Sequence, residues 1–497
     1  MTINSSSQST QNSEQSRANY QNVGLVLGPA LFALMMLFDH SQNTMPLEAW
    51  RTAAIGIWMA IWWATEAVPV PVTAFIPLVT FELLGVSDFK DTAAPFANPI
   101  IFLFMGAFFL AIAVERWNLH KRIALLILTR TGTNGGHLIA GFMVVAALLS
   151  MWMTNTSTTM MLLPIGLSVV QVISDNVKNL GDKQRKDFQA AMLLSLAYGA
   201  TIGGLATLIG TPPNALLAAF LAENYDIHLD FVTWMAVGVP VSAIMLPLAW
   251  LTLTKISFKV DIQANDSVKQ HLSRLRHELG PMSSAEKRVA VIFFLVVVAW
   301  MTRGILMDTL GFSGLSDAGI VMAAALLLFL LPSKSKDQYQ LLTWHDANRV
   351  PWGVLILFGG GLSLAAAVSD SGLAQWLGES LMPLTAFGVI ALIIAATAMV
   401  IFLTELTSNV ATTATFLPVV AAIAFQADLS PLLLTVPITL AASCAFMLPV
   451  ATPPNAIVFA SGMLTIPQMI RSGLILNLVG MVLLSVVAIW WAPWLLA

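Results

Sequence analysis

Two polar motifs, each present twice, stand out in this otherwise apolar chain. The string N-x-x-T-T-x4-P begins at Asn155 and again at Asn409, and the string T-P-P-N-A covers residues 211–215 and 452–456. Asn, Ser and Thr oxygens, together with loop carbonyls, are hard ligands of the kind that hard cations prefer. One such cluster in a membrane helix usually joins neighbouring helices. Two motifs duplicated at matching places indicate a binding site instead.

The same motifs offer an anion site that needs no cationic side chain. In each TPPN string the threonine is suited to cap the following helix, and the first proline suits the first helical position. A helix that begins there presents free N–H groups carrying about half a positive charge. The Asn-rich strings start helices similarly, so four helix ends are expected to attract an anion. No Lys or Arg occurs in 136–173, 386–426 or 431–460.

The membrane potential links the two kinds of site. A charge that crosses the membrane changes its energy by about 2.3 kcal/mol per 100 mV, so a dianion entering an inside-negative cell alone pays roughly twice that amount. Co-transported cations remove this cost, and the hard oxygens of the motifs suit Na⁺. The residues therefore suggest cation-coupled transport of an anion.

Composition places these motifs in a membrane protein. Of the 497 residues, 57% are hydrophobic and 10% are charged, and the mean hydropathy is +0.81. A soluble domain has roughly a quarter of its residues charged, so lipid must cover much of this chain. The net charge of −3 gives no reason to expect a nucleic-acid partner. The single cysteine, Cys444, excludes disulfide scaffolds and cysteine-ligated metal clusters.

Hydropathy predicts an all-α polytopic membrane protein with two re-entrant hairpins. The apolar stretches 136–173 and 386–426 are interrupted by TNTSTT and TSNVATT, and each predicts two short helices that meet at a tip. At about 20 apolar residues per crossing, we expect about eleven transmembrane helices, over 22–38, 50–66, 70–86, 99–115, 190–221, 232–254, 289–307, 318–332, 351–368, 431–460 and 473–496. The stretches 190–221 and 431–460 contain the TPPN strings and predict broken helices. Residues 1–21 are polar and predict a disordered cytoplasmic tail.

The basic residues test this topology. If the tail is inside, each span crosses once and each hairpin returns to its own side, only Arg51, Lys90 and Arg303 of the 23 Lys and Arg residues face outside. Cytoplasmic loops are enriched in Lys and Arg. The distribution therefore supports eleven crossings, with a cytoplasmic N-terminus and a periplasmic C-terminus.

The chain also divides into two repeats. A glycine-containing stretch precedes each motif asparagine by a similar distance, from Gly106 to Asn155 and from Gly360 to Asn409. Each repeat holds five crossings, an odd number, so the second lies inverted relative to the first. Such repeats with discontinuous helices are typical of secondary transporters. The predicted divisions are a first span with its loop, repeat 1, a cytoplasmic linker and repeat 2, at 22–48, 49–255, 256–288 and 289–497.

Three further features need an interpretation. Glu66 and Glu405 are ionisable groups near or within the bilayer; they could carry protons, but we favour structural pairing. The amphipathic stretch 117–128 predicts an interfacial helix. The histidines lie in loops or near span ends, and we expect them to be solvated: His40, His120, His137, His228, His271, His277 and His345.

Several strings resemble one family of transporters. GATIGGLATLIGTPPNALL and CAFMLPVATPPNAIVF look like the paired signatures of the divalent anion/sodium symporter family, and TEAVPVPVTAFIPLV, NPIIFLFMGAFFLA and WGVLILFGGGL are also similar to it. The resemblance covers about residues 49–497. It implies a scaffold domain that dimerises, and a transport domain that holds both hairpins and both broken helices. The transport domain would move substrate by an elevator-like shift.

The resemblance also implies a set of site residues. Carboxylates of a dicarboxylate would be bound by the tips and broken helices, at Asn155, Thr156, Thr211, Ser408, Asn409, Val410, Thr452 and Pro453. One sodium ion would be held by Ser150, Thr154, Asn155 and the carbonyl of Gly210. The second would be held by Thr404, Thr407, Asn409 and the carbonyl of Ala451. The family's tips read Ser-Asn-Thr, so Val410 departs from the pattern and lacks one hydroxyl.

The function expected from this sequence is sodium-coupled symport of C4-dicarboxylates (succinate, fumarate or malate) by a homodimer in a bacterial inner membrane. Sodium is the coupling ion, and no other cofactor is expected. The alternatives are a sodium-independent exchanger of dicarboxylates, citrate or 2-oxoglutarate, and a sodium:sulfate symporter. An enzyme is disfavoured because neither H-E-x-x-H nor G-x-S-x-G occurs. Reciprocal hairpins suit alternating access better than a channel.

Overall fold

A computed structural model describes residues 18–39, 45–132, 134–176, 181–262, 266–311, 314–335, 339–381, 383 and 387–491. Within these ranges the chain is almost entirely helical, and an isolated β-bridge joins Pro332 and Gln340. Most of the predicted tail, and His40, lie outside the described residues. The prediction of an all-α polytopic protein is confirmed.

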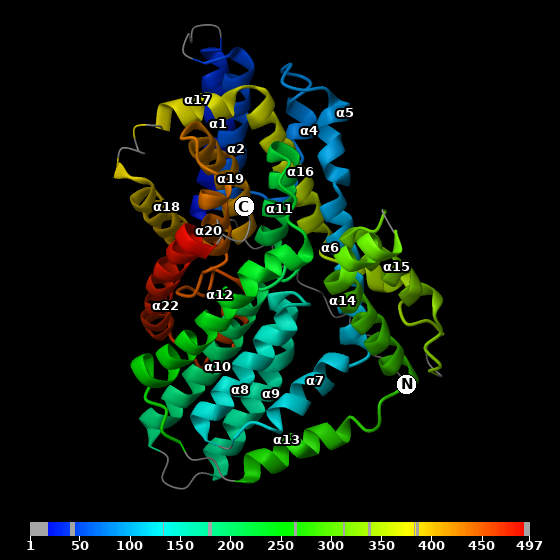
Figure 1. The fold of residues 1–497 in the computed structure, drawn as a ribbon. Helices are drawn as coiled ribbons and strands as arrows, with labels where there is room; N and C mark the ends of the chain where they lie inside the picture. Colours follow the sequence, from blue (N-terminus) through cyan, green and yellow to red (C-terminus); the bar gives the residue numbers. More distant parts are fainter. Residues whose placement is uncertain are drawn as a thin grey trace, which may run out of the picture.

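The first part of the chain ends in a helix that lies across the bundle (Figure 1). Its helices are α1 (Asn19–Leu37), α2 (Leu47–Thr65), α3 (Val70–Thr73), α4 (Ile76–Thr80), α5 (Phe89–Ala93), η1 (Ala94–Ala97), α6 (Pro99–Arg116), α7 (Leu119–Leu128), α8 (Gly135–Ser150), α9 (Asn155–Asn176), α10 (Asp182–Gly204), α11 (Pro212–Tyr225), α12 (Phe231–Leu251), the π-helix η2 (Thr252–Ser257) and α13 (Asp266–Glu278).

The second part begins with a long apolar helix and ends in one that packs against α12 and η2 of the first part. Its helices are α14 (Ser284–Leu310), α15 (Asp317–Leu330), η3 (Trp344–Arg349), α16 (Trp352–Asp370), α17 (Leu373–Leu381), α18 (Val389–Leu403), α19 (Asn409–Gln426), α20 (Leu432–Ala442), α21 (Pro453–Phe459), α22 (Ile466–Val486) and the π-helix η5 (Val487–Trp491).

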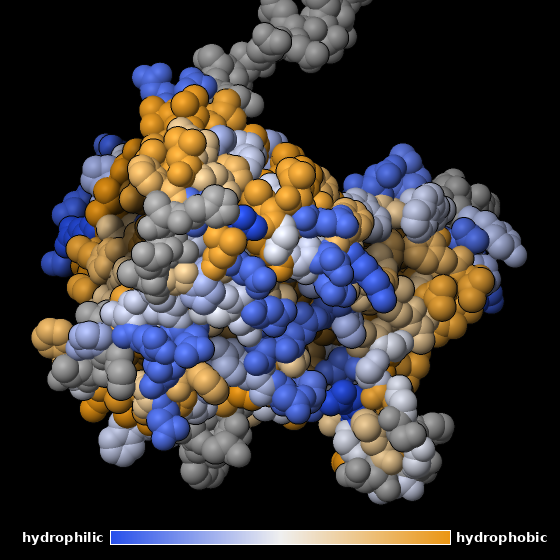
Figure 2. Space-filling model, turned by 90° about the horizontal axis from the view of Figure 1, so that it is seen from above, coloured by the Kyte–Doolittle hydropathy of each residue, from blue (hydrophilic) through white to orange (hydrophobic). Residues whose placement is uncertain are grey.

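Eight helices in the described chain are long and apolar enough to cross a membrane, and shorter apolar helices accompany them. Many carry apolar side chains on their outer face; Phe294, Leu295 and Ile305 of α14 are more than half exposed. Viewed from above, hydrophobic residues gather around the rim of the molecule and hydrophilic residues gather towards the middle of the face (Figure 2). This distribution is the one that lipid around the rim requires.

The predicted single span at 70–86 is wrong. That stretch holds two short helices, α3 and α4, followed by turns. Pro77 lacks the N–H that would bond to the carbonyl of Thr73, and its ring crowds that carbonyl. Helix α3 therefore ends at Thr73, and α4 begins anew with Pro77 in its first turn.

The helix breaks fall within the motifs. Helix α8 ends at Ser150 and α9 begins at Asn155, and likewise α18 ends at Leu403 and α19 begins at Asn409. Helices α10 and α11 are separated by 205–211, and α20 and α21 by 443–452. Pro212 and Pro453 occupy the first position of the helices that follow, where a missing N–H costs nothing.

The hairpins and broken helices pack as one interlocked unit. Helix α10 packs along α8 and α9, and α20 packs along α18 and α19. Beyond the breaks the partners cross over, because α11 packs on α19 while α21 packs on α9. Helices α8 and α10 approach closely: a Cβ on Gly203 would lie 2.3 Å from the carbonyl oxygen of Ala147.

The predicted helix over 117–128 is present as α7, which packs against α13. One expectation for this region is wrong, since His120 is only 2% exposed and its Nδ1 lies 2.9 Å from the carbonyl oxygen of Val114. Burial lowers the pKa of this imidazole, although the Val114 contact opposes the shift. The helix buries the ring because position 120 faces the protein side of α7.

Candidate functional site

At the first tip a serine and an asparagine from opposite arms of the hairpin meet. The hydroxyl of Ser150, the last residue of α8, donates a hydrogen bond to Oδ1 of Asn155, the first residue of α9, at 2.5 Å. A Cβ on Gly204 would lie 2.6 Å from Asn155 Oδ1 and 3.1 Å from the carbonyl oxygen of Gly210. Three of the predicted ligands of the first sodium ion, Ser150, Asn155 and Gly210, therefore lie together.

The fourth predicted ligand, Thr154, is engaged locally. Its hydroxyl accepts the backbone N–H of Ser157 at 3.1 Å and lies 3.0 Å from the Ser157 hydroxyl. This is the bond that caps the first turn of a helix. A role for Thr154 at the sodium site stays a prediction.

The second tip repeats the contact of the first. The hydroxyl of Thr404 lies 2.9 Å from Oδ1 of Asn409, and it also lies 2.7 Å from the carbonyl oxygen of Ala442. Thr404 precedes Asn409 by five residues, as Ser150 precedes Asn155. The two halves thus present the same pair of oxygens, a hydroxyl and an amide, at equivalent places.

Two predicted ligands of the second sodium ion make hydrogen bonds outside this pair. The hydroxyl of Thr407 lies 2.6 Å from that of Thr412 and donates to the carbonyl oxygen of Leu403. Ala451 is buried in the loop before α21, where its N–H bonds to Leu448, and among the described residues no hydrogen bond joins it to the tip. The contact of Thr404 with Asn409 is observed, and a role for Thr407 and Ala451 at the second sodium site stays a prediction.

The predicted substrate residues differ in accessibility. Thr156, Ser408 and Val410 are half-buried beside the tip asparagines. Val410 packs against the apolar core, so its departure from the family pattern leaves a side chain with apolar neighbours.

The threonines of the two TPPN strings are not equivalent. Thr211 and Thr452 are buried at the N-cap positions of α11 and α21, and Pro453 is exposed. The Thr452 hydroxyl accepts the N–H of Asn455 at 3.4 Å. Thr211 makes no such side-chain bond, contrary to the expected cap, because the N–H of Asn214 bonds to the Thr211 carbonyl instead.

Sequence reasoning favoured structural pairing for Glu405 but did not identify its partners. This carboxylate is 3% exposed, and it accepts the backbone N–H groups of Phe446, Met447 and Leu448 at 2.7–3.1 Å. Asn477 Nδ2 also donates to it, at 2.7 Å. Glu405 therefore ties the second tip to the loop of the broken helix, which is the structural pairing that we favoured. The only signal in the sequence was an acidic residue beside the tip.

The first tip is tied to its loop by a different bond. The position equivalent to Glu405 holds Met151, whose carbonyl oxygen accepts the hydroxyl of Thr207 at 2.6 Å. Glu66, by contrast, is exposed at the end of α2 in a left-handed conformation, with φ of 48°. Its carbonyl oxygen, rather than its carboxylate, accepts a bond from Gln21.

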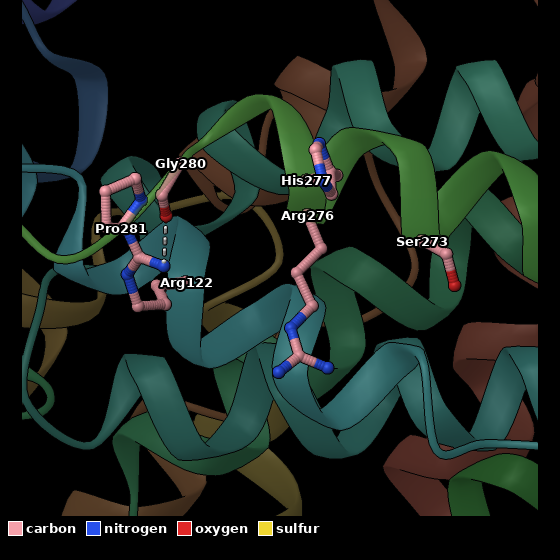
Figure 3. A pocket seen from close by; sticks show the side chains of 6 residues that line it. All are labelled: Arg122, Ser273, Arg276, His277, Gly280 and Pro281. Atoms are coloured by element: carbon pink, nitrogen blue, oxygen red, sulfur yellow. Dashed lines mark hydrogen bonds between the residues drawn. The ribbon is translucent and has the colours of Figure 1, made fainter.

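A cavity of about 500 Å³ lies away from these motifs (Figure 3). It is formed at the end of α13, where Arg122 of α7 bonds to the Gly280 carbonyl and Arg276 is another of the lining residues. Arg122 is also paired with Glu286. No predicted site residue lines this cavity. The oxygens suited to sodium and the helix ends suited to carboxylates lie at the tips and loops.

The fold and these motifs define a polytopic, all-helical membrane transporter. Comparison with known families identifies the family of transporters to which the chain belongs. Residues 20–497 match the family described as the sodium:sulfate symporter transmembrane region, and the chain belongs to this family of divalent anion/sodium symporters.

Curated relatives match over nearly the full chain. The sodium-dependent dicarboxylate transporter of Staphylococcus saprophyticus is 41% identical over 478 residues, which are 95% of this chain and 92% of the relative. The sodium-dependent dicarboxylate transporter of Staphylococcus aureus is 40% identical over 476 residues, which are 95% of this chain and 91% of the relative. The family and these relatives are transporters, as the sequence predicted.

Proposed function

We propose that this protein is a sodium-coupled symporter that carries C4-dicarboxylates such as succinate, fumarate or malate into the cell. One observation carries the proposal: each hairpin tip presents the same hydroxyl–amide pair, Ser150 with Asn155 and Thr404 with Asn409. Hard oxygen pairs of this kind suit sodium. The names of the relatives, which are 40–41% identical, support both the ion and the substrate class.

The substrate carboxylates bind at the helix ends that begin in the same motifs. Helices α9, α19, α11 and α21 start there, and their free N–H groups favour negative charge. Sodium ions at the neighbouring oxygens offset the charge of the dianion. Without them, entry against an inside-negative potential costs roughly 4–5 kcal/mol per 100 mV for two charges.

The interlocked packing of the hairpins and broken helices supports movement of this unit as one body. Because α11 packs on α19 and α21 packs on α9, neither half can shift alone. In the proposed elevator mechanism this transport domain slides against a scaffold that dimerises. The two halves are inverted repeats, the hairpins are re-entrant, and the protein lies in the inner membrane with its N-terminus in the cytoplasm.

Uptake of labelled substrates into proteoliposomes tests the proposal. With an inward sodium gradient we expect succinate to accumulate, and replacement of sodium by potassium should abolish the uptake. Labelled citrate and sulfate in parallel reactions test the other substrates that the family could carry. Equal succinate uptake with and without sodium would favour an exchanger, and uptake of sulfate alone would favour a sulfate symporter.

A further inference from the structure

The two broken helices contain a matched pair of buried asparagines. Asn214 and Asn455 are the fourth residues of the two TPPN strings, and each is the third residue of its helix, α11 or α21. Both side chains are 0% exposed. Burying an asparagine inside an apolar bundle costs free energy unless its amide is hydrogen-bonded.

The amide of each asparagine holds its own loop. Nδ2 of Asn214 lies 3.1 Å from the carbonyl oxygen of Gly204 and 2.8 Å from that of Thr207. Nδ2 of Asn455 lies 3.1 Å from the carbonyl oxygen of Ala445 and 3.0 Å from that of Leu448.

The acceptors occupy equivalent positions at the two helix breaks. In both cases they lie ten and seven residues before the asparagine. The same bonds therefore recur in both halves, although the loops are otherwise unlike in sequence, LATLIGT in one and SCAFMLPVAT in the other. Recurrence in two unlike loops argues that the bonds serve a shared purpose.

The carbonyl contacts also set the orientation of each amide. Carbonyl oxygens accept only from the NH2 side of a carboxamide, so Nδ2 must face the loop and Oδ1 must face away. Oδ1 of Asn214 and Oδ1 of Asn455 are both buried, and neither has a hydrogen-bond partner among the described residues. A buried acceptor is unfavourable without a partner, so the same cost is tolerated at both places.

The loops that these amides hold are the ones that adjoin the tip oxygens. Gly204, whose carbonyl Asn214 binds, lies against both Asn155 Oδ1 and the Gly210 carbonyl. Leu448, whose carbonyl Asn455 binds, also donates its N–H to Glu405 beside the second tip. If a loop moved away from its asparagine, the Gly210 carbonyl in one half and the Leu448 N–H in the other would move away from the tip.

We propose that Asn214 and Asn455 are positioning residues for the two cation sites, each clamping its loop so that the loop carbonyls meet the tip oxygens in binding geometry. The proposal rests on the proposed sodium coupling. The asparagine at the fourth position of each TPPN string then has a role distinct from substrate contact, because its NH2 group already donates to the carbonyls at the helix break.

The test compares Asn214→Ala and Asn455→Ala with the wild type in proteoliposomes. Each variant should raise the sodium concentration for half-maximal succinate uptake about tenfold or more, the usual effect of losing a group that orients a metal ligand. The KM for succinate at saturating sodium should stay within about twofold of the wild-type value, since the contacts that bind substrate remain.

Asn224→Ala is the matched control. Asn224 also lies in α11, and its Nδ2 also donates to a carbonyl, at 2.9 Å, but that carbonyl belongs to Phe220 in the same helix. Its sodium dependence should equal that of the wild type. An unchanged sodium requirement in Asn214→Ala and Asn455→Ala, with a sodium-dependent wild type, would overturn the positioning role alone. Wild-type succinate uptake that does not depend on sodium would instead overturn the proposed function.

Hydrogen exchange of the wild-type protein decides the matter if the variants do not fold. The amides of 205–211 and 443–452 should be protected nearly as well as the flanking helices, and protection should rise when sodium is added. Rapid exchange that sodium leaves unchanged would contradict a clamped loop.

Discussion

Replacing Glu405 by glutamine tests how strongly this carboxylate stabilises the loop between α20 and α21. The carboxylate offers two oxygens to three backbone N–H groups and to Asn477. A carboxamide keeps one acceptor oxygen and places an NH2 group where the other was. That NH2 group would face the N–H of Leu448, so a donor would meet a donor.

The size of the effect follows from these contacts. A hydrogen bond to a charged group contributes about 1.5–3 kcal/mol, and a buried N–H left without an acceptor costs about 1–3 kcal/mol. Removing a buried charge relieves some desolvation and offsets part of this loss. We therefore expect Glu405→Gln to lower the free energy of unfolding by about 2–4 kcal/mol.

Chemical unfolding in detergent micelles, followed by tryptophan fluorescence, measures this difference. Glu379→Gln is the matched control, because Glu379 is exposed and accepts one bond from Gln375; it should change stability by less than about 0.5 kcal/mol. A stability of Glu405→Gln equal to that of the control would refute the reasoning. If that variant instead lost only the pH dependence of uptake, Glu405 would be a proton carrier.

Three further predictions concern the tips and the topology. Cysteine introduced at Lys183 should react with an impermeant reagent only from the cytoplasmic side, and cysteine at Asp226 only from the outside, because one crossing separates them. Asn155→Ala and Asn409→Ala should each abolish sodium-driven uptake without loss of expression, because each removes an oxygen of a hydroxyl–amide pair. Val410→Thr should strengthen apparent dicarboxylate affinity about two- to tenfold if the new hydroxyl meets a carboxylate.

Each of these predictions has a clear contrary result. Labelling of both introduced cysteines from one side would contradict the inverted repeats. Near-normal uptake by either alanine variant would place the ion sites elsewhere. Unchanged affinity in Val410→Thr would mean that position 410 only packs against the core, where the native valine already lies.

Much of the local structure could be predicted from the residues. The helix breaks lie at TNTSTT, TSNVATT and the two TPPN strings because prolines and clustered hydroxyl and amide groups act on neighbouring backbone. The same local physics also explains the error at 70–86. An apolar stretch of spanning length was taken as one helix, although Pro77 was sufficient to end α3 at Thr73.

The duplicated motifs identified the tip asparagines, but not their partners. The pairs Ser150 with Asn155 and Thr404 with Asn409 follow from residues five apart across a short turn, so spacing alone brings them near. Thr407 and Ala451 were carried over from the resemblance. In the structure the Thr407 hydroxyl lies beside that of Thr412 and the Ala451 N–H bonds to Leu448, and their role as sodium ligands stays a prediction.

The tertiary structure alone decided which distant groups meet. Glu405 binds a loop about forty residues away, and α11 crosses to pack on α19. Such contacts depend on how whole helices pack, and hydropathy records only that a segment is apolar, not which apolar surface it will cover. Asparagine at position 214 or 455 reads in the sequence as one more polar residue. Only the fold, by bringing two carbonyls to each amide, turns it into the group that holds its loop.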